Sequence, residues 1–240
     1  MYNGDHSVTF GEKNSWKDWF LIPSSRPVIN PPSVKTHYVD VPGGNGKIDL
    51  TESLTGHPVY DNRTGSLEFY VENGHKDWDV LYSEISNYLH GKTMKMVLED
   101  APYFYYEGRY AVNNWKSDPG YSIITIDYDV YPYAKEPSSL EPWLWDPFDF
   151  ELGIIREYSS MIVKGRLDLE IVGREEHVIP IIEITTSEGT GMDVEFEGST
   201  YHFPDGETRN RKISIGGGET KIISFIGTGK VTVDYQGGSL

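Results

Sequence analysis

Short segments in which apolar and polar residues alternate, separated by turns rich in glycine and proline, recur along most of the 240-residue chain. An alternation of period two places apolar side chains on one face of a strand, whereas a helix needs a period near 3.6. The 25 glycines and 14 prolines favour turns at short intervals. Tyrosine and tryptophan, which prefer strands and interfaces, dominate the aromatic residues. The sequence therefore predicts a β-rich protein.

One segment of the N-terminal part has a different period. Its apolar residues recur at spacings of three and four, which places them on one stripe of a helix. Gly91 stands where a C-terminal helix cap is expected. Strands are predicted on both sides, among them Ser66–Val71 and Tyr121–Tyr131. One helix among several strands indicates an α+β domain over residues 1–134, with the helix covering one sheet face. The stripe comprises Trp78, Leu81, Tyr82, Ile85, Tyr88 and Leu89.

Residues 135–152 interrupt this pattern and are predicted to be an interdomain linker. The stretch carries three prolines, a pair of serines and several acidic residues. It also contains Trp143, Trp145, Phe148 and Phe150. These side chains are too apolar for a freely solvated tether, so we expect the linker to pack against a domain or a neighbouring subunit.

Residues 153–240 show strand patterns alone, at short and fairly even intervals. Such a series is typical of a β-sandwich. We interpret Gly227-Thr228-Gly229 as a hairpin turn between the last two strands. The strand candidates are Leu167–Val172, Val178–Ile184, Val194–Phe196, Tyr201–Phe203, Lys212–Ile215, Lys221–Ile226 and Lys230–Tyr235.

Charge and composition exclude several classes of function. The formal net charge is −16, so the chain lacks the basic surface that binding to nucleic acid or an anionic membrane requires. The chain has no cysteine, which excludes disulfides, zinc–thiolate sites and cysteine nucleophiles. The N-terminus lacks the pattern of a signal peptide, and no apolar stretch has the length of a membrane span.

No pattern predicts a catalytic, metal or cofactor site. The segment Gly43–Lys47 looks like a phosphate loop, but Ile48 follows the lysine where such a loop needs serine or threonine. The Gly216–Gly218 run precedes no helix, so both segments are interpreted as turns. Asp127 and Asp129, and likewise the adjacent pair Glu99-Asp100, could serve as the acids of a glycosidase. That chemistry requires two carboxyl groups that face each other across a substrate cleft. The sequon Asn62-Arg63-Thr64 matches the glycosylation pattern by residue type alone. The isolated histidines are His6, His37, His57, His75, His90, His177 and His202.

A set of ordered motifs remains after this search. In the N-terminal part they are Lys35-Thr36, Val39–Gly43, Gly46–Glu52, Gly56, Tyr60, Asn62-Arg63, Leu89–Lys92, Tyr105–Arg109 and Tyr131–Tyr133. Taken together, these motifs resemble the N-terminal domain of distal tail proteins from siphophages and prophages, with the strongest likeness over residues 34–133. Trp145–Glu151 resembles that family's junction to its second domain, and Tyr235–Leu240 its C-terminus.

The resemblance implies a structural protein of a phage tail tip or baseplate with no enzymatic activity. It implies that residues 1–134 form a homohexameric ring at the end of the tail tube. The ring would join the tube and tape-measure proteins to tail-associated and receptor-binding proteins. It implies that residues 153–240 are a galectin-like β-sandwich, and that the protein is made in the bacterial cytoplasm and resides in the virion tail tip. DNA would pass through the ring without being bound specifically.

Two other classes of function remain open at this point. The first is a module that binds host cell-wall glycan through residues 150–240, although the galectin sugar-binding signature is missing and no tryptophan follows Trp145. The second is a cell-wall hydrolase. The excess of acidic residues could line a ring lumen and repel passing DNA, or could form a solvated outer surface. Arg63 and Arg109 are predicted to make contacts within or between subunits, and Asp49 and Thr51 to form local hydrogen bonds.

Overall fold

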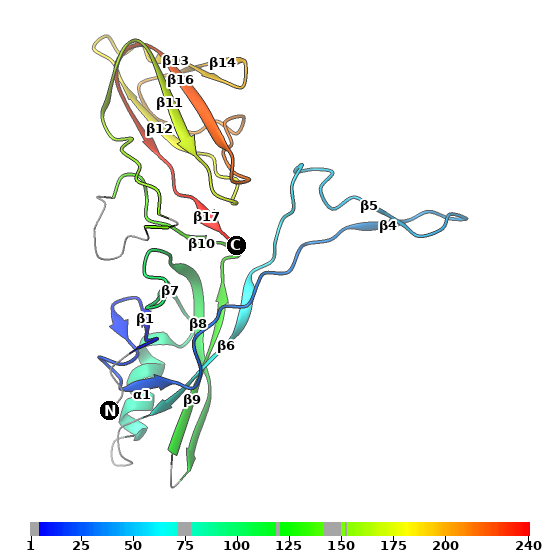
Figure 1. Ribbon diagram of the computed structural model, residues 1–240, viewed down its shortest axis with the longest axis vertical. Helices are drawn as coiled ribbons and strands as arrows, with labels where there is room; N and C mark the ends of the chain where they lie inside the picture. Colours follow the sequence, from blue (N-terminus) through cyan, green and yellow to red (C-terminus); the bar gives the residue numbers. More distant parts are fainter. Residues whose placement is uncertain (1–4, 72–77, 119–120, 142–149, 152) are drawn as a thin grey trace. The chain divides into compact units, whose positions relative to one another are not determined.

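A computed structural model describes the chain except residues 1–4, 72–77, 119–120, 142–149 and 152. The chain divides into two compact units (Figure 1). The first comprises Met1–Ala101 with Tyr105–Pro132, and the second comprises Pro102–Phe104 with Tyr133–Leu240. The fold is β-rich with a single helix among the described residues, as predicted. Residues 135–141 of the predicted linker belong to the second unit, whereas most of its remainder lies outside the described residues.

The first unit is built on a seven-stranded antiparallel sheet. Strand β8 and strand β9 form its long central hairpin, and β6 pairs with β9 from Arg63 to Tyr70. Alternation along these strands buries one face and leaves the other to solvent. In spatial order the strands are β2 (Lys13–Asn14), β1 (Val8–Phe10), β7 (Lys92–Leu98), β8 (Tyr106–Asp118), β9 (Tyr121–Val130), β6 (Arg63–Val71) and β3 (Leu21–Pro23).

Helix α1 (Trp78–Leu89) covers the buried face of this sheet, which confirms the predicted stripe. Ile85 and Leu89 are fully buried, and each contributes about 1.5–3 kcal/mol of hydrophobic stabilisation. The Trp78 ring packs edge-on against Trp115 of β8, with 5.8 Å between ring centroids. The helix ends at Leu89, and Gly91 two residues later has φ of 75°, the left-handed conformation that follows a helix C-terminus.

The second unit is a β-sandwich in which two long strands serve both sheets. The strands are β11 (Met161–Val172) and β16 (Thr220–Asp234), and all of β11 pairs with β16 from Thr220 to Val231. The first half of β16 also pairs with β13 (Met192–Phe196), and β13 with β14 (Ser199–Phe203). The second half pairs with β12 (Ile181–Thr185), and β12 with β15 (Gly206–Thr208).

The predicted hairpin at Gly227–Gly229 is wrong, because β16 continues through these residues. Its 15 residues would span about 50 Å if straight. Yet the N–H of Gly173 donates to Glu219 just before β16, and the N–H of the adjacent Arg174 donates to the Tyr235 hydroxyl just after it. The strand therefore bends back on itself, as Figure 1 shows for β11 and β16.

Glycine permits this bend. Gly227, with φ of 149°, lies opposite Gly165, with φ of 85°, so both strands turn at one level. A β-carbon on Gly229 would come within 2.4 Å of the Thr185 carbonyl oxygen. The glycines that suggested a turn in the sequence instead form the corner between two sheets. The core enclosed there includes Val163, Ile171, Val194, Phe203, Phe225, Val231 and Tyr235.

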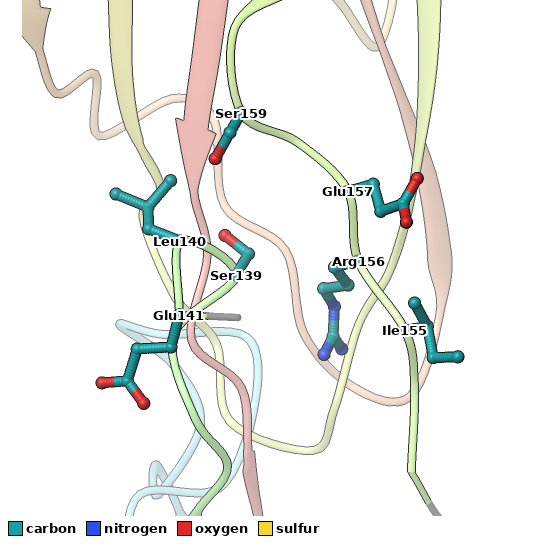
Figure 2. Close-up of a pocket in the computed structure, with 7 residues that line it drawn as sticks. All are labelled: Ser139, Leu140, Glu141, Ile155, Arg156, Glu157 and Ser159. Carbon is teal, nitrogen blue, oxygen red and sulfur yellow. The ribbon is translucent and has the colours of Figure 1, made fainter. Parts of the chain in front are cut away.

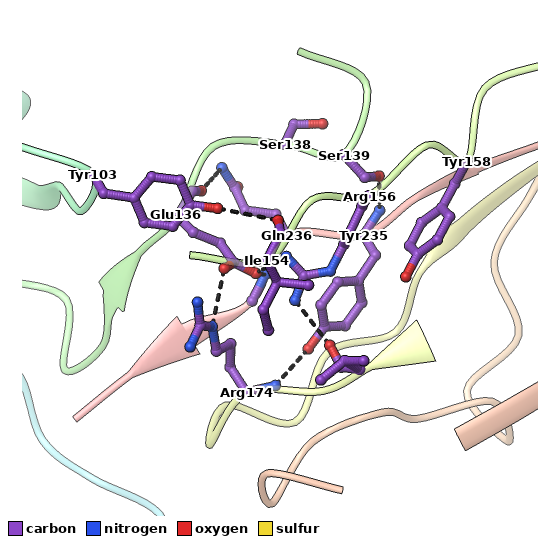
Figure 3. Close-up of polar contacts among 12 residues, drawn as sticks. Tyr103, Glu136, Ser138, Ser139, Ile154, Arg156, Tyr158, Arg174, Tyr235 and Gln236 are labelled. Carbon is purple, nitrogen blue, oxygen red and sulfur yellow. Dashed lines mark hydrogen bonds and ion pairs between the residues drawn. The ribbon is translucent and has the colours of Figure 1, made fainter. Parts of the chain in front are cut away.

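A buried carboxylate joins the segments at one end of this sandwich (Figure 3). Glu136 follows β10 (Ala134–Lys135), which pairs with β17 (Gly238–Ser239) at the C-terminus. Its side chain is completely buried and forms ion pairs with Arg156 at 2.6 Å and Arg174 at 3.0 Å. The N–H of Gly237 donates to the same carboxylate. Four segments that are remote in sequence thus meet at one side chain.

We expect Glu136→Gln to destabilise the second unit by about 3–5 kcal/mol, because it leaves buried guanidinium groups without a compensating charge. Urea unfolding combined with hydrogen exchange of residues 153–240 measures this loss. Glu141→Gln, which changes an exposed carboxylate nearby, serves as the control and should change stability by less than about 0.5 kcal/mol. Equal stability of the two variants would contradict this role of Glu136.

Candidate assembly surface

Residues 31–62 form an extended two-stranded arm that projects from the sheet of the first unit (Figure 1). Strand β4 (Tyr38–Asp40) pairs with β5 (Lys47–Asp49), and closer to the sheet Val34 forms a bridge with Tyr60. No residue between 31 and 60 is buried. A two-stranded hairpin without a hydrophobic face packed on a core is at best marginally stable in water. The arm therefore lacks the stabilisation that a partner surface would provide.

The strand register sorts the arm's side chains onto two different faces. Val39 stands opposite Ile48, and the N–H of Leu50 donates to His37 one step along the same face. The opposite face carries Tyr38, Asp40, Lys47 and Asp49. Ile48 is 51% exposed and Leu54, at the bend after β5, is 97% exposed. The arm thus presents an apolar face that no described residue of its own unit buries, which is typical of a protein–protein contact.

Local hydrogen bonds shape the arm, as predicted for Asp49 and Thr51. The N–H of Thr51 donates to the Asp49 carboxylate at 2.9 Å, and the Thr51 hydroxyl accepts from the N–H of His37 at 3.0 Å. Hydrogen bonds from Thr51 lower the pKa of Asp49. Gly43 and Gly46 have φ near 79° and 76° in the predicted turn that joins the strands. These bonds preserve the arm's shape without burying it.

The root of the arm is held by the buried guanidinium of Arg63. Its Nε donates to the carbonyl of Pro132 at 2.5 Å, and its Nη1 to the carbonyl of Asn30 at 3.5 Å. Asn30 ends the chain's approach to the arm and Arg63 begins β6 beyond it, so this side chain ties both ends of the arm to the sheet. Burial lowers the pKa of Arg63. Gly65 leaves the space needed here, since a β-carbon would lie 2.7 Å from the Asn30 amide nitrogen.

We expect Arg63→Lys to loosen the arm, because a lysine ammonium cannot reach both carbonyls as the planar guanidinium does. Amide hydrogen exchange in residues 31–62 should become faster, by an amount equivalent to about 1–3 kcal/mol of local stability. Arg109→Lys is the control, since Arg109 bonds to the Gly91 carbonyl and not to the carbonyls of Asn30 and Pro132. Unchanged exchange in the arm would show that Arg63 does not anchor it.

Of the carboxylate pairs considered as glycosidase acids, Asp127 and Asp129 lie on the open face of the sheet, whereas Glu99 and Asp100 lie in the turn after β7. Asp127 and Asp129 share one face of β9, and Asp129 lies beside Arg109 in the register and accepts from the Asn62 amide at 2.7 Å. Glu99 accepts from the N–H of Ser7, while Asp100 bonds to His6 and Arg26. The structure therefore places the two pairs in separate hydrogen-bonded settings and does not bring them together.

Other sequence candidates also have structural partners. The N–H groups of Gly217 and Gly218 donate to the backbone carbonyls of Glu175 and Arg174, so this run is a turn, as predicted. His202 bonds to Asp193 at 2.8 Å. Within the described ranges, no three His, Asp or Glu side chains gather as metal ligands would. No helix in that part of the chain is long and apolar enough to cross a membrane.

The second unit contains a polar cavity of about 570 Å³ (Figure 2). The side chain of Arg156 is 3% exposed, and its charge is already paired with Glu136 while its Nη2 donates to the Val172 carbonyl. Ser139 bonds to Val233 and Tyr235. None of the described lining residues is aromatic, so these residues offer no platform for stacking a sugar ring. The lining comprises Ser139, Leu140, Glu141, Ile155, Arg156, Glu157 and Ser159.

Comparison with known proteins bears on the fold as a whole. No protein-family model matches the sequence, and no curated protein sequence matches it. Among solved structures, the Dit protein of phage SPP1 matches with a TM-score of 0.65, covering 96% of this chain and 98% of that one. The chain has a Dit-like fold. Sequence identity is 11%, so the likeness rests on the arrangement of strands. The crystal structure of SPP1 Dit is described as a paradigm of the hub adsorption apparatus in phages that infect Gram-positive bacteria.

The arm was not recognised in the sequence as a surface. Val39, Ile48 and Leu50 alternate with polar residues in the way that strands packed on a core do. The signal for an isolated hairpin is the density of turn residues between Pro42 and Gly46, with no further strand-like apolar segment close to it in the sequence.

Proposed function

We propose that this protein is a structural component of a phage or prophage tail tip, forming a hexameric ring that joins the tail tube to tip and receptor-binding proteins. The observation that carries the proposal is the Dit-like fold over 96% of the chain. The arm supports it independently, because its uncovered apolar face requires a partner. The role is one of assembly rather than catalysis.

The arm suits a ring contact on grounds of symmetry. A contact in which one copy's arm meets a different surface of the next copy is heterologous, and it closes into a ring when the rotation fits. Each subunit then gives one arm and receives one, so every apolar face is covered. The sequence motifs that resemble distal tail proteins support this assignment, because Lys35, Asp49, Thr51 and Arg63 all fall on the arm or its root.

The second unit extends the same proposal. We assign it as the galectin-like sandwich of the ring's outer side, through which tail-associated and receptor-binding proteins attach. The protein is made in the bacterial cytoplasm and resides in the virion tail tip. Its strong negative charge fits a channel through which DNA passes without adhering.

Light scattering on the purified protein tests the ring. Six copies of 27.3 kDa give a mass of about 164 kDa, and negative-stain images should show rings with a central hole. A protein that stays monomeric at high concentration and binds purified cell-wall saccharide would contradict the ring and favour the glycan-binding alternative.

Substitutions on the two faces of the arm test the contact itself. Val39→Asp or Ile48→Asp places a charge on the apolar face and should reduce the mass towards that of a monomer, weakening association at least about tenfold. Circular dichroism should stay unchanged, since these side chains lie outside the hydrophobic core of the first unit. Lys47→Ala, on the charged face, is the matched control and should leave the ring intact. A hexamer that tolerates Ile48→Asp would exclude the arm as the ring contact.

A further inference from the structure

Strand β11 has one open edge within the second unit. It pairs with β16 along its whole length, and no other strand of the described residues pairs with it. The N–H of Gly173 donates to Glu219 in line with this ladder, so the backbone groups of odd-numbered residues face β16. Those of even-numbered residues face the open edge, where the carbonyls of Glu170 and Val172 accept side-chain donors.

The charges along this edge change sign at its centre. Lys164 and Arg166 stand on one side of Leu167, and Asp168 and Glu170 on the other. All four charged side chains are exposed on the outer face of the sheet, where Arg166 forms ion pairs at 2.8 Å with Asp168 and with Glu195 of the same chain. Pairing with a second copy would exchange the Arg166–Asp168 contact within the chain for the same contact between chains. At the ends of the strand stand two exposed apolar residues, Ile162 at 62% and Val172 at 37%. An open edge strand is a template for pairing with another chain.

We infer that the β11 edge binds the β11 edge of a second copy, as an antiparallel pair about a two-fold axis at Leu167. This rotation places Arg166 opposite Asp168 of the second copy and Lys164 opposite Glu170, each pair occurring twice. Ile162 meets Val172 in the same register. The backbone groups of even-numbered residues face the edge, but the carbonyls of Glu170 and Val172 already accept from Tyr158 and Arg156, so the ladder hydrogen bonds are expected between Arg166 and Asp168.

Charge selects this register over its neighbours. A shift that brings Arg166 opposite Arg166, or Asp168 opposite Asp168, places like charges directly across the ladder, which destabilises the pair. A parallel arrangement likewise aligns the basic halves with each other. Exposed charges disfavour pairing of this edge with unrelated strands. The order of the charges along β11 favours antiparallel pairing with β11 of a second copy.

This contact is distinct from the ring contact of the arm. It is isologous, so it is complete after two copies and cannot propagate around a six-fold ring. It joins two free subunits, or two rings through their second units. Tyr158 and Arg156 cover the edge at Glu170 and Val172, which centres the contact on Arg166–Asp168.

Disulfide trapping tests the axis directly, because the chain contains no cysteine of its own. At the axis, Leu167 faces Leu167 in a non-hydrogen-bonded pair with about 4.5 Å between α-carbons, a separation that a disulfide spans. Under mild oxidation, Leu167→Cys should give a cross-linked dimer. Glu170→Cys, which lies about 20 Å from its counterpart in this register, is the control. Equal cross-linking of the two variants would overturn the proposal.

Charge exchange tests the register in solution. Ile48→Asp removes the proposed ring contact. In a protein that carries this substitution, sedimentation therefore measures the equilibrium between the monomer and the dimer formed through β11. If Ile48→Asp leaves a hexamer, the proposed arm contact fails, and the disulfide test still decides the β11 contact. Arg166→Asp should weaken dimerisation at least about tenfold, and adding Asp168→Arg should restore it. Thermal unfolding controls for the fold. The contact would be refuted if Arg166→Asp left the dimerisation affinity unchanged, or if adding Asp168→Arg did not restore it.

Discussion

The second unit depends on a single buried carboxylate. Glu136 has no solvent contact, yet it neutralises Arg156 and Arg174 and accepts the N–H of Gly237. Desolvating such charges is expensive, so a cluster of this kind adds little net stability over a well-packed apolar one. Its effect is selective, because any other arrangement of these four segments leaves a buried charge unpaired. The carboxylate thereby fixes where the sandwich begins and where the chain ends.

The arm of the first unit follows the opposite principle. Hydrogen bonds and glycines define its shape, and Arg63 fixes its root, but no hydrophobic burial stabilises it within the subunit. The apolar face of Val39, Ile48 and Leu50 is thus available for contacts between subunits. A surface that is ordered before it binds loses less conformational entropy on binding. An arm that is ordered but uncovered is therefore suited to a contact between subunits.

Sequence patterns predicted local structure well where periodicity decides it. The stripe from Trp78 to Leu89 became α1, and the turn at Pro42–Gly46 joins β4 to β5. Periodicity shows which face of a strand is apolar, but not what covers that face, so the arm was not foreseen. Gly227–Gly229 suggested a hairpin because glycine permits both reversal and bending, and only the pairing of β12 and β13 with one strand decides between them. Glu136 appeared to be one acid of a linker, since its partners lie at least 20 positions away.

The corner at Gly165 and Gly227 also determines how the second unit responds to force. Because β11 and β16 belong to both sheets, neither sheet can open while the other remains closed. The chain enters through β10 and ends at β17, which pair antiparallel, and that short ladder carries a pull before the core does. Once the β10–β17 ladder has opened, the two sheets resist the pull together, so the unit either stays folded or unfolds as a whole. Such a unit acts as a rigid coupling rather than as a spring.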